Sequence, residues 1–503
     1  MSIVLEFVLR GDVVALIVDY VIDALEGWSV AFVDKSFAVA ALRVMNWRCV
    51  DFLAPGLRKK TMDSKVCLSV GAAAFRRCAS RKLFSKRCEA FLVAEEPRED
   101  RPRRRFAHST IVDRRGRLVV FGGRDSDEFM DDTWALDPFV EDRWTRLEFD
   151  GEAPRARRAH AAAYVEESDE MIIVGGGTQT ESFGDVYALN FSRKNQWRQV
   201  LKIPEWTAFG HVLARVSLDD NKICFLVHGG ATHDRDTGMF LAHDEAKAFF
   251  LDKDKEPIRV RHEGSRPLAR YRHTCTALEK RNQFLLVGGY VLHPFVGMSA
   301  GFVDRLTYCS SDVWLLDVST TEDDKLQVLT LKWTVVDVGK QFPPRGGHAA
   351  LALGNGVLVL GGGVQYTSFP PRRDDPTEED FDSVWFLEGT KATQCDVKLP
   401  SPRGGTTAVV APLQCQRTAH FGILIFGGRD YHHDGRRHRG RDDLAFIPMV
   451  SSPVRLTGGG LKDDDLLPTR ENKASLKRHA GENNPNNPKN SDHPATYDLA
   501  AAG

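Results

Sequence analysis

The sequence predicts an all-β fold in which six four-stranded sheets form a ring, preceded by a small α-helical domain and followed by a disordered tail. Two observations carry this prediction. A composite motif occurs six times, at intervals close to the period of about 50 residues typical of repeated four-stranded units. Within each copy, short apolar runs are bounded by glycine, proline and charge, as strands are. One such sheet cannot bury both its faces, whereas neighbouring sheets in a ring can.

The motif joins an Arg/His position, an apolar run that ends in Gly-Gly, and an Asp-Val-Trp-like run. In the first copy these are Arg105 and His108, Leu118 to Gly123, and Asp132 to Asp137, with Trp144 after them. The Gly-Gly pairs begin at Gly122, Gly175, Gly229, Gly288, Gly361 and Gly427. We predict strand A after the Arg/His position, strand B before Gly-Gly, strand C at the Asp-Val-Trp run and strand D at the later Trp.

Two residue types in the motif carry specific structural expectations. Gly-Gly suits a backbone that turns with positive φ or passes close to a neighbouring sheet. The tryptophans supply large apolar area between neighbouring sheets. Copies three and five lack the strand D Trp, and copy six has Thr406 where the strand A His would stand.

Six Gly-Gly motifs in register with their flanking residues resemble the kelch family of β-propellers, over about Pro102 to Met449. The resemblance implies one six-bladed propeller, assigned here to residues 88–457. In kelch propellers the B–C and D–A loops share one face, which often binds a protein partner. The resemblance therefore implies an interaction protein rather than an enzyme.

Residues 1–87 are predicted to form a small helical domain. Val13, Leu16, Ile17, Val21 and Leu25 fall at helical spacing after Asp12, a suitable N-cap. A helical head before kelch repeats is similar to F-box–kelch proteins, which implies a Skp1-type adaptor and a role as substrate receptor of a ubiquitin ligase. The Leu-Pro pair that usually opens an F-box is absent. A helical cap that only packs on the propeller is the alternative.

The composition narrows the partner classes. The formal net charge is −1, which gives no electrostatic argument for nucleic acid or a membrane surface. The nine cysteines form no CxxC pair and suit a reducing compartment, so we expect a cytoplasmic or nuclear protein. Residues 458–503 are polar and predicted to be disordered, because they lack the apolar residues that would offset the loss of chain entropy.

Ring closure requires an outermost strand for the sixth copy. Val450 to Leu456 follows directly but contains Pro453, which cannot donate to a ladder. Glu89 to Glu95, with Phe91-Leu92-Val93, lies just before the first copy, in the place of the strand D that precedes every later copy. The sequence favours Glu89 to Glu95, which would join the two ends of the propeller.

Arginines and aromatics on the B–C and D–A loops are the candidate partner-binding residues, because variable loops on a rigid scaffold usually carry recognition and guanidiniums hold carboxylates or phosphates. The candidates are Arg105, Arg124, Arg158, Arg270, Arg272, Tyr290, Arg345, Tyr366, Arg403 and Arg429. Arginine is also part of the repeat, so pairing with acids of the propeller itself is the alternative role.

No cofactor or metal is predicted. Histidine recurs at the start of strand A in five copies, and a residue that every copy carries is better explained by a hydrogen bond or packing than by metal binding. The sequence contains no Walker loop, Gly-x-Ser-x-Gly or HExxH motif. A propeller enzyme with a metal or small-molecule site at the channel mouth remains the alternative function, since such sites are built from dispersed loops.

Overall fold

The computed structural model describes residues 91–94, 101–137, 143–218, 222–233, 240–252, 258–292, 307–323, 326–354, 356–364, 379–415, 418–430, 439–448 and 454–455. All of them lie in one compact unit, Met1–Gly459. They form strands and no helix, so the all-β prediction is confirmed for this part of the chain. The predicted helical domain, the predicted disordered tail and Tyr366 lie outside the described residues.

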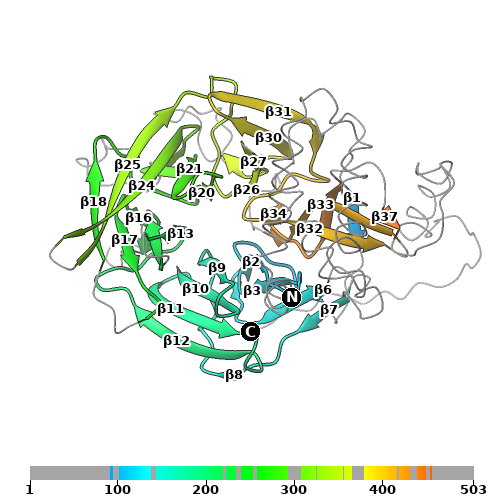
Figure 1. Ribbon diagram of the computed structural model, residues 1–503. Coiled ribbons are helices and arrows are strands. Elements are labelled where there is room, and N and C mark those ends of the chain that lie inside the picture. The colour runs from blue at the N-terminus through cyan, green and yellow to red at the C-terminus, as the bar shows by residue number, and fades with distance from the viewer. Residues whose placement is uncertain are drawn as a thin grey trace, which may run out of the picture. The chain divides into compact units, whose positions relative to one another are not determined.

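Repeats one and two each build an antiparallel sheet with the predicted A-B-C-D order (Figure 1). The strands of repeat one are β2 (Ser109–Val112), β3 (Leu118–Phe121), β6 (Thr133–Asp137) and β7 (Arg143–Arg146). Those of repeat two are β9 (Ala161–Val165), β10 (Glu170–Gly177), β11 (Ser182–Asn190) and β12 (Gln196–Lys202), with β8 (Asp150–Gly151) parallel to β12.

Repeats four, five and six keep the same order. Repeat four contains β20 (Thr274–Ala277), β21 (Gln283–Val287), β24 (Val313–Asp323) and β25 (Leu326–Val336). Repeat five contains β26 (Ala349–Leu353), β27 (Gly356–Leu360), β30 (Ser383–Glu388) and β31 (Lys391–Lys398). Repeat six contains β32 (Thr407–Cys415), β33 (Thr418–Phe426) and β36 (Leu444–Pro448), and its outer strand is β1 (Phe91–Ala94).

Repeat three departs from the predicted four strands. Its described sheet has β13 (Val212–Ser217), β14 (Ile223–His228) and β17 (Ala246–Phe249). Ile258, the residue just before the next strand, forms a single bridge to Ala248, and β18 (Arg259–Glu263) itself pairs in parallel with β25 of repeat four. This pairing is possible because β25, with 11 residues, offers a ladder edge to β18.

Further strands of two or three residues lie in the loops that follow the Gly-Gly pairs, and one lies at the start of repeat four. They are β4 (Arg124–Asp125), β5 (Glu128–Phe129), β15 (Ala231–His233), β16 (Phe240–Ala242), β19 (Arg270–Tyr271), β22 (Tyr290–Leu292), β23 (Thr307–Cys309), β28 (Gly363–Val364), β29 (Glu379–Asp380), β34 (Arg429–Asp430) and β35 (Arg439–Gly440). They hold the predicted B–C loops against the ring.

The innermost strands close a cycle. Each strand A contacts the strand A of the next repeat, from β2 through β9, β13, β20, β26 and β32 back to β2. Just before these strands, one backbone N–H per repeat donates to the C=O of the preceding repeat at 2.6–2.8 Å, from Ala107 to Gly405 and onward around the ring. The six linked residues are Ala107, Ala159, Gly210, Arg272, Gly347 and Gly405, all with positive φ.

Apolar side chains fill the spaces between neighbouring sheets. Trp197 packs with residues of repeats one and two, and Trp333 with residues of repeats three and four. Trp144 lies 5.0 Å from Phe426 between repeats one and six, ring centroid to ring centroid. The predicted role of the tryptophans between sheets is therefore confirmed for these three.

The outer strand of repeat six comes from the start of the chain, as predicted. In β1, Phe91 pairs with Phe446 and Leu92 with Ala445 of β36. The described part of the competing segment is β37 (Val454–Arg455), which pairs with Thr418 and Ala419 at the far end of β33 and not with β36. The two ends of the ring are thus joined by hydrogen bonds between segments more than 350 residues apart in the chain.

A chain that begins at Arg98 is expected to melt about 5 °C or more below one that begins at Cys88, because losing β1 leaves the edge of β36 unpaired. Both chains lack the head, so only the strand differs. Thermal unfolding followed by circular dichroism measures the difference. A synthetic peptide of residues 88–97 should restore part of the loss. Equal melting temperatures would contradict the closing role of β1.

Candidate functional site

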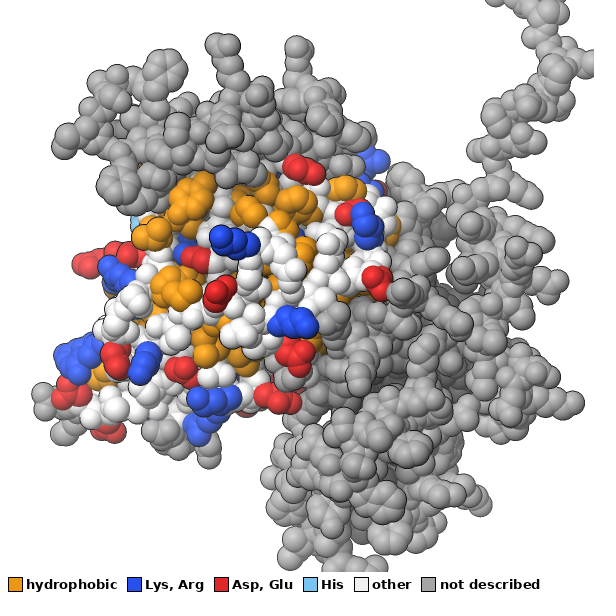
Figure 2. All heavy atoms as spheres, turned by 90° about the horizontal axis from the view of Figure 1, so that it is seen from above, with side chains coloured by type: hydrophobic (Ala, Val, Ile, Leu, Met, Phe, Trp, Pro, Cys, Tyr) orange, Lys and Arg blue, Asp and Glu red, His pale blue; other side chains and the backbone are white. Residues whose placement is uncertain are grey.

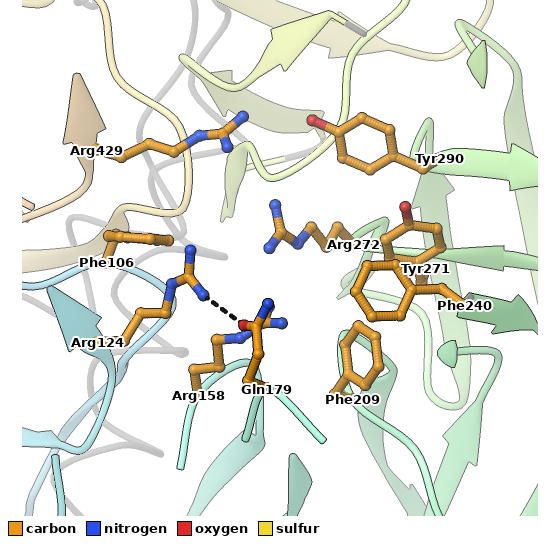
Figure 3. A pocket seen from close by; sticks show the side chains of 10 residues that line it. All are labelled: Phe106, Arg124, Arg158, Gln179, Phe209, Phe240, Tyr271, Arg272, Tyr290 and Arg429. Carbon is orange, nitrogen blue, oxygen red and sulfur yellow. Dashed lines mark hydrogen bonds between the residues drawn. The ribbon is translucent and has the colours of Figure 1, made fainter. Parts of the chain in front are cut away.

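A pocket of about 190 Å³ opens where the B–C and D–A loops converge (Figure 3). Its lining combines four arginines with five aromatic rings and one glutamine. The lining residues are Phe106, Arg124, Arg158, Gln179, Phe209, Phe240, Tyr271, Arg272, Tyr290 and Arg429.

Two positions of the repeat supply most of this lining. The residue directly after Gly-Gly is Arg124 in repeat one, Tyr290 in repeat four and Arg429 in repeat six. The second position lies two residues before the strand A histidine, and it holds Phe106 and Arg158 in repeats one and two, then Phe209 and Tyr271 in repeats three and four. The two positions pair within a repeat, as Phe106 does with Arg124.

The Gly-Gly pairs explain how the backbone turns from strand B into the loops at the opening of the pocket, called here the mouth. Both glycines of every pair have positive φ. In repeat four, the Gly289 N–H donates to the Arg345 carbonyl of the next repeat at 2.9 Å, and a Cβ on Gly288 would lie 2.5 Å from the same oxygen. Both predicted reasons for glycine, positive φ and close approach to a neighbouring sheet, are confirmed.

A second set of arginines lies beneath the mouth and is wholly buried: Arg105, Arg157, Arg270, Arg345 and Arg403 are each 0 % exposed. Arg270 illustrates their contacts. Its Nη1 donates to Asp312 Oδ1 at 2.6 Å and to the Gly288 carbonyl at 2.9 Å, and its Nη2 donates to Asp312 Oδ2 at 2.8 Å. Each of these arginines binds the Gly-Gly turn to the start of strand C in its own repeat.

This geometry corrects four of the candidate partner-binding residues. Arg105, Arg270, Arg345 and Arg403 are inaccessible to a partner, because each is committed to hydrogen bonds inside its repeat. Their role is the structural alternative that the sequence left open. Arg157 plays the same part and was missed, although its spacing to His160, three residues, equals that of Arg105 to His108.

The other candidates in the described part of the chain come together at the mouth. Arg124, Arg158, Arg272, Arg429 and Tyr290 all line the pocket. The sequence missed Phe106, Phe209, Phe240, Tyr271 and Gln179. Three of these occupy the repeated position two residues before the strand A histidine, a signal that alignment of the six copies contains. That these residues bind a partner stays a prediction.

Like charges crowd this pocket. Burial, and then the neighbouring Arg272 and Arg124 guanidiniums, hold the pKa of Arg158 well below its ordinary value. Burial, followed by the charge of Arg272, lowers the pKa of Arg124 to about 10. Among the described residues that line the pocket there is no aspartate or glutamate. Keeping Arg158 and Arg124 charged therefore costs free energy in the folded state relative to the unfolded chain.

Each arginine is nevertheless held in place. Arg124 lies over the Phe106 ring at 5.0 Å and donates to Gln179 Oε1 at 3.2 Å. Arg158 lies over Phe209 at 5.2 Å, and Arg272 over Tyr290 at 6.0 Å, each from Cζ to the ring centroid. Arg429 lies 3.7 Å from Asp380, measured from Nε to Oδ1. Cation–π contacts position the guanidiniums without neutralising them.

The repeated histidines lie below the mouth, between sheets. His108 Nε2 shares a 2.8 Å hydrogen bond with Thr407 Oγ1 of repeat six, and His160 Nε2 shares one of 2.8 Å with Ser109 Oγ of repeat one. His348 Nε2 does the same with Thr274 Oγ1 at 2.8 Å. The predicted role of these three, a hydrogen bond at the start of strand A, is confirmed.

Two further features are absent from the described residues. No group of three or more His, Cys, Asp or Glu side chains there is arranged to hold a metal ion. No helix there has the length and apolar character needed to cross a bilayer. On the face seen in Figure 2, basic and acidic side chains are interspersed among apolar ones, in contrast with the one-signed pocket.

A match to one family model agrees with the repeats found in the sequence. Residues 86–230 match the family model described as the KLHDC2/KLHL20/DRC7 Kelch-repeats domain. Among solved structures, the chain is similar to one described as "Structure of YjhT", with 14% sequence identity and a TM-score of 0.47. That similarity covers 72% of this chain and 98% of the other. The family match supports the kelch-repeat resemblance.

Proposed function

We propose that this protein is an interaction protein whose arginine pocket binds an anionic segment of a protein partner. One observation carries the proposal. Burial and the neighbouring charge of Arg272 oppose the charges of Arg124 and Arg158, and stability alone gives no reason to gather these three arginines in one pocket. An anionic ligand would offset that repulsion through charge-assisted hydrogen bonds.

The surroundings of the pocket favour a protein segment as the ligand. The pocket opens among the B–C and D–A loops, and several of its residues belong to short strands of these loops, such as Arg124 in β4 and Phe240 in β16. Aromatic and arginine side chains together are the residue types that anchor protein interfaces. A propeller enzyme is the competing function, and stoichiometric metal in the purified protein would favour it.

Selection from a random peptide library displayed on phage tests the proposal. Wild-type protein should enrich Asp- and Glu-rich peptides, and Arg158→Gln should reduce their binding by roughly 10-fold or more. Arg155→Gln is the matched control, because Arg155 is an exposed arginine of the same loop that pairs with Glu181 at 3.1 Å. Acidic peptides that bind both variants equally, or no acidic enrichment, would contradict the proposal.

Folding of the variant can be checked independently. Removing the Arg158 charge relieves repulsion, so the melting temperature of Arg158→Gln should equal or exceed that of wild type. A loss of binding with an unchanged melting temperature then reflects the pocket and not the fold.

We further infer that residues 88–457 form one six-bladed kelch propeller and that residues 1–87 form a helical domain of F-box type, which would make the protein a cytoplasmic or nuclear substrate receptor of a ubiquitin ligase. The layout of a short head before the repeats supports this role. A Skp1-type adaptor should co-purify with the full chain and be lost when the residues before Asp51 are deleted. Retention of the adaptor by the shortened chain would contradict an F-box.

A further inference from the structure

The pocket has two chemically different sides (Figure 3). Arg429, Arg124 and Arg158 lie on one side, with the Arg272 guanidinium reaching toward them. Tyr290, Tyr271, Phe240 and Phe209 form the other side, called here the aromatic wall. An aliphatic acidic side chain would engage the first side alone, so the second side carries additional information about the ligand.

The aromatic wall is an assembled structure. Tyr271 and Tyr290 are stacked, with ring centroids 5.3 Å apart and planes 27° apart. Phe240 meets Phe209 edge to face at 5.1 Å. Gly346 lies against the Tyr290 ring so closely that any Cβ there would collide with it. Phe240 is only half-buried, so its ring presents apolar surface to the pocket.

The cationic side calls for more than one negative charge. Arg429 has Asp380 beside it at 3.7 Å, and the charge of Asp127 acts on Arg124, but none of the described residues that line the pocket is a carboxylate. One carboxylate carries a single charge and two acceptor oxygens. A phosphate monoester carries nearly two charges at neutral pH and three acceptor oxygens, a better match for three guanidiniums.

We propose, as a refinement that rests on the proposed function, that the pocket binds the side chain of a phosphorylated tyrosine in a protein partner. The phosphate lies among Arg124, Arg158 and Arg272, where it accepts their N–H groups. The phenyl ring packs against Phe240 and Tyr271. One ligand group thereby uses both sides of the pocket.

Isothermal titration calorimetry with three small probes separates ring from charge. Phenyl phosphate carries both, methyl phosphate lacks the ring, and phenyl sulfate has the ring but one charge. Phenyl phosphate should bind roughly 10-fold more tightly than methyl phosphate, from ring packing. It should also bind roughly 10-fold more tightly than phenyl sulfate, from the second charge. Equal affinity of phenyl phosphate and either probe would overturn the proposal.

Substitutions test which side of the pocket binds the ring and which binds the phosphate. Phe240→Ala should remove most of the advantage of phenyl phosphate over methyl phosphate, measured as the ratio of the two affinities in the same variant. Arg158→Gln should weaken both phosphates by 10-fold or more, and Arg155→Gln neither. A Phe240→Ala protein that retains the full phenyl preference would contradict the role of the aromatic wall.

Peptide libraries test whether the bound group belongs to a protein. Each library has random flanking residues and one fixed central residue, which is phosphotyrosine, phosphoserine or tyrosine. The phosphotyrosine library should bind more tightly than free phenyl phosphate and than the phosphoserine and tyrosine libraries. If Asp- and Glu-rich peptides bind through Arg158 but phosphotyrosine gives no advantage, this refinement fails and the proposed function stands. If neither class binds, both fail.

Discussion

Acidifying the protein from pH 7 to pH 5 is expected to lower its free energy of unfolding by several kcal/mol. The cause is a set of buried histidines whose neutral form the folded state favours. Burial lowers the pKa of His108, His211, His228 and His348 from 6.5 to about 3, with the charge of a nearby buried arginine adding to it for His108, His228 and His348.

The direction follows from proton linkage. Below pH 6.5 the unfolded chain takes up protons on these histidines, whereas the folded chain does not until about pH 3. Their contribution to stability is therefore full above pH 6.5 and is lost as the pH falls toward 3. At pH 5 each such histidine contributes a loss of roughly 2 kcal/mol.

Urea unfolding at a series of pH values measures this loss. The slope of the unfolding free energy against pH between 5 and 6.5 counts the protons taken up on unfolding. Ordinary carboxyl groups titrate near pH 4, so this window isolates the histidines. A folded His348→Asn variant should show a shallower slope than wild type. An unfolding free energy that does not change across the window would refute the prediction.

Asp312→Ala is expected to destabilise the protein by about 3–5 kcal/mol, because it leaves the Arg270 guanidinium buried without a carboxylate. Asp312 accepts two hydrogen bonds from Arg270 and one from Trp314 Nε1 at 2.8 Å. Burial opposes ionisation of Asp312, but the hydrogen bonds and charge of Arg270 outweigh it and hold the pKa of the carboxyl below its ordinary value.

Asp317→Ala is the matched control, in the strand β24 that follows Asp312. Asp317 pairs with Lys280 at 3.3 Å and accepts a hydrogen bond from Gln283 Nε2 at 2.8 Å, but its side chain is 38% exposed, so its removal should change stability by only about 1 kcal/mol. Chemical denaturation of both variants at pH 7 makes the comparison. Similar small losses for the two variants would show that the buried pair does not hold the Gly-Gly turn as its geometry indicates.

Much of the fold could be predicted because the repeat carries its own physical reasons. Gly-Gly marks a turn that excludes any Cβ, and the apolar run before it is buried on both faces, as in β3 and β27. The exchange of β18 from repeat three to repeat four could not be predicted. It depends on the free edge of β25, a tertiary property that no local pattern in Arg259–Glu263 announces.

The candidate site, like the fold, could be predicted only in part from the sequence. Sequence gathered Arg105 and Arg124 into one class, since both are arginines of loops on one face. The structure separates them, because Arg105 binds Asp132 inside the repeat whereas Arg124 lines the channel mouth. The distinguishing signal is register, three residues before the strand A histidine against directly after Gly-Gly. Of the aromatic wall, the sequence singled out only Tyr290. It could not indicate Phe240, which belongs to a different loop from Phe209 and meets that ring only in three dimensions.

The ring should open most easily at repeat five, where the contact of the buried arginine is weaker than in the other repeats that carry one. Where four other repeats place an aspartate opposite the buried arginine, repeat five places Ser383, whose Oγ lies 3.2 Å from Arg345 Nη2. Burial then lowers the pKa of Arg345 to about 9, a sign that its charge is poorly compensated. Strain on the ring of sheets should be released first in this repeat, and among the Gly-Gly pairs amide hydrogen exchange should be fastest at Gly361 and Gly362, whose N–H groups donate to Ser383 and Arg403.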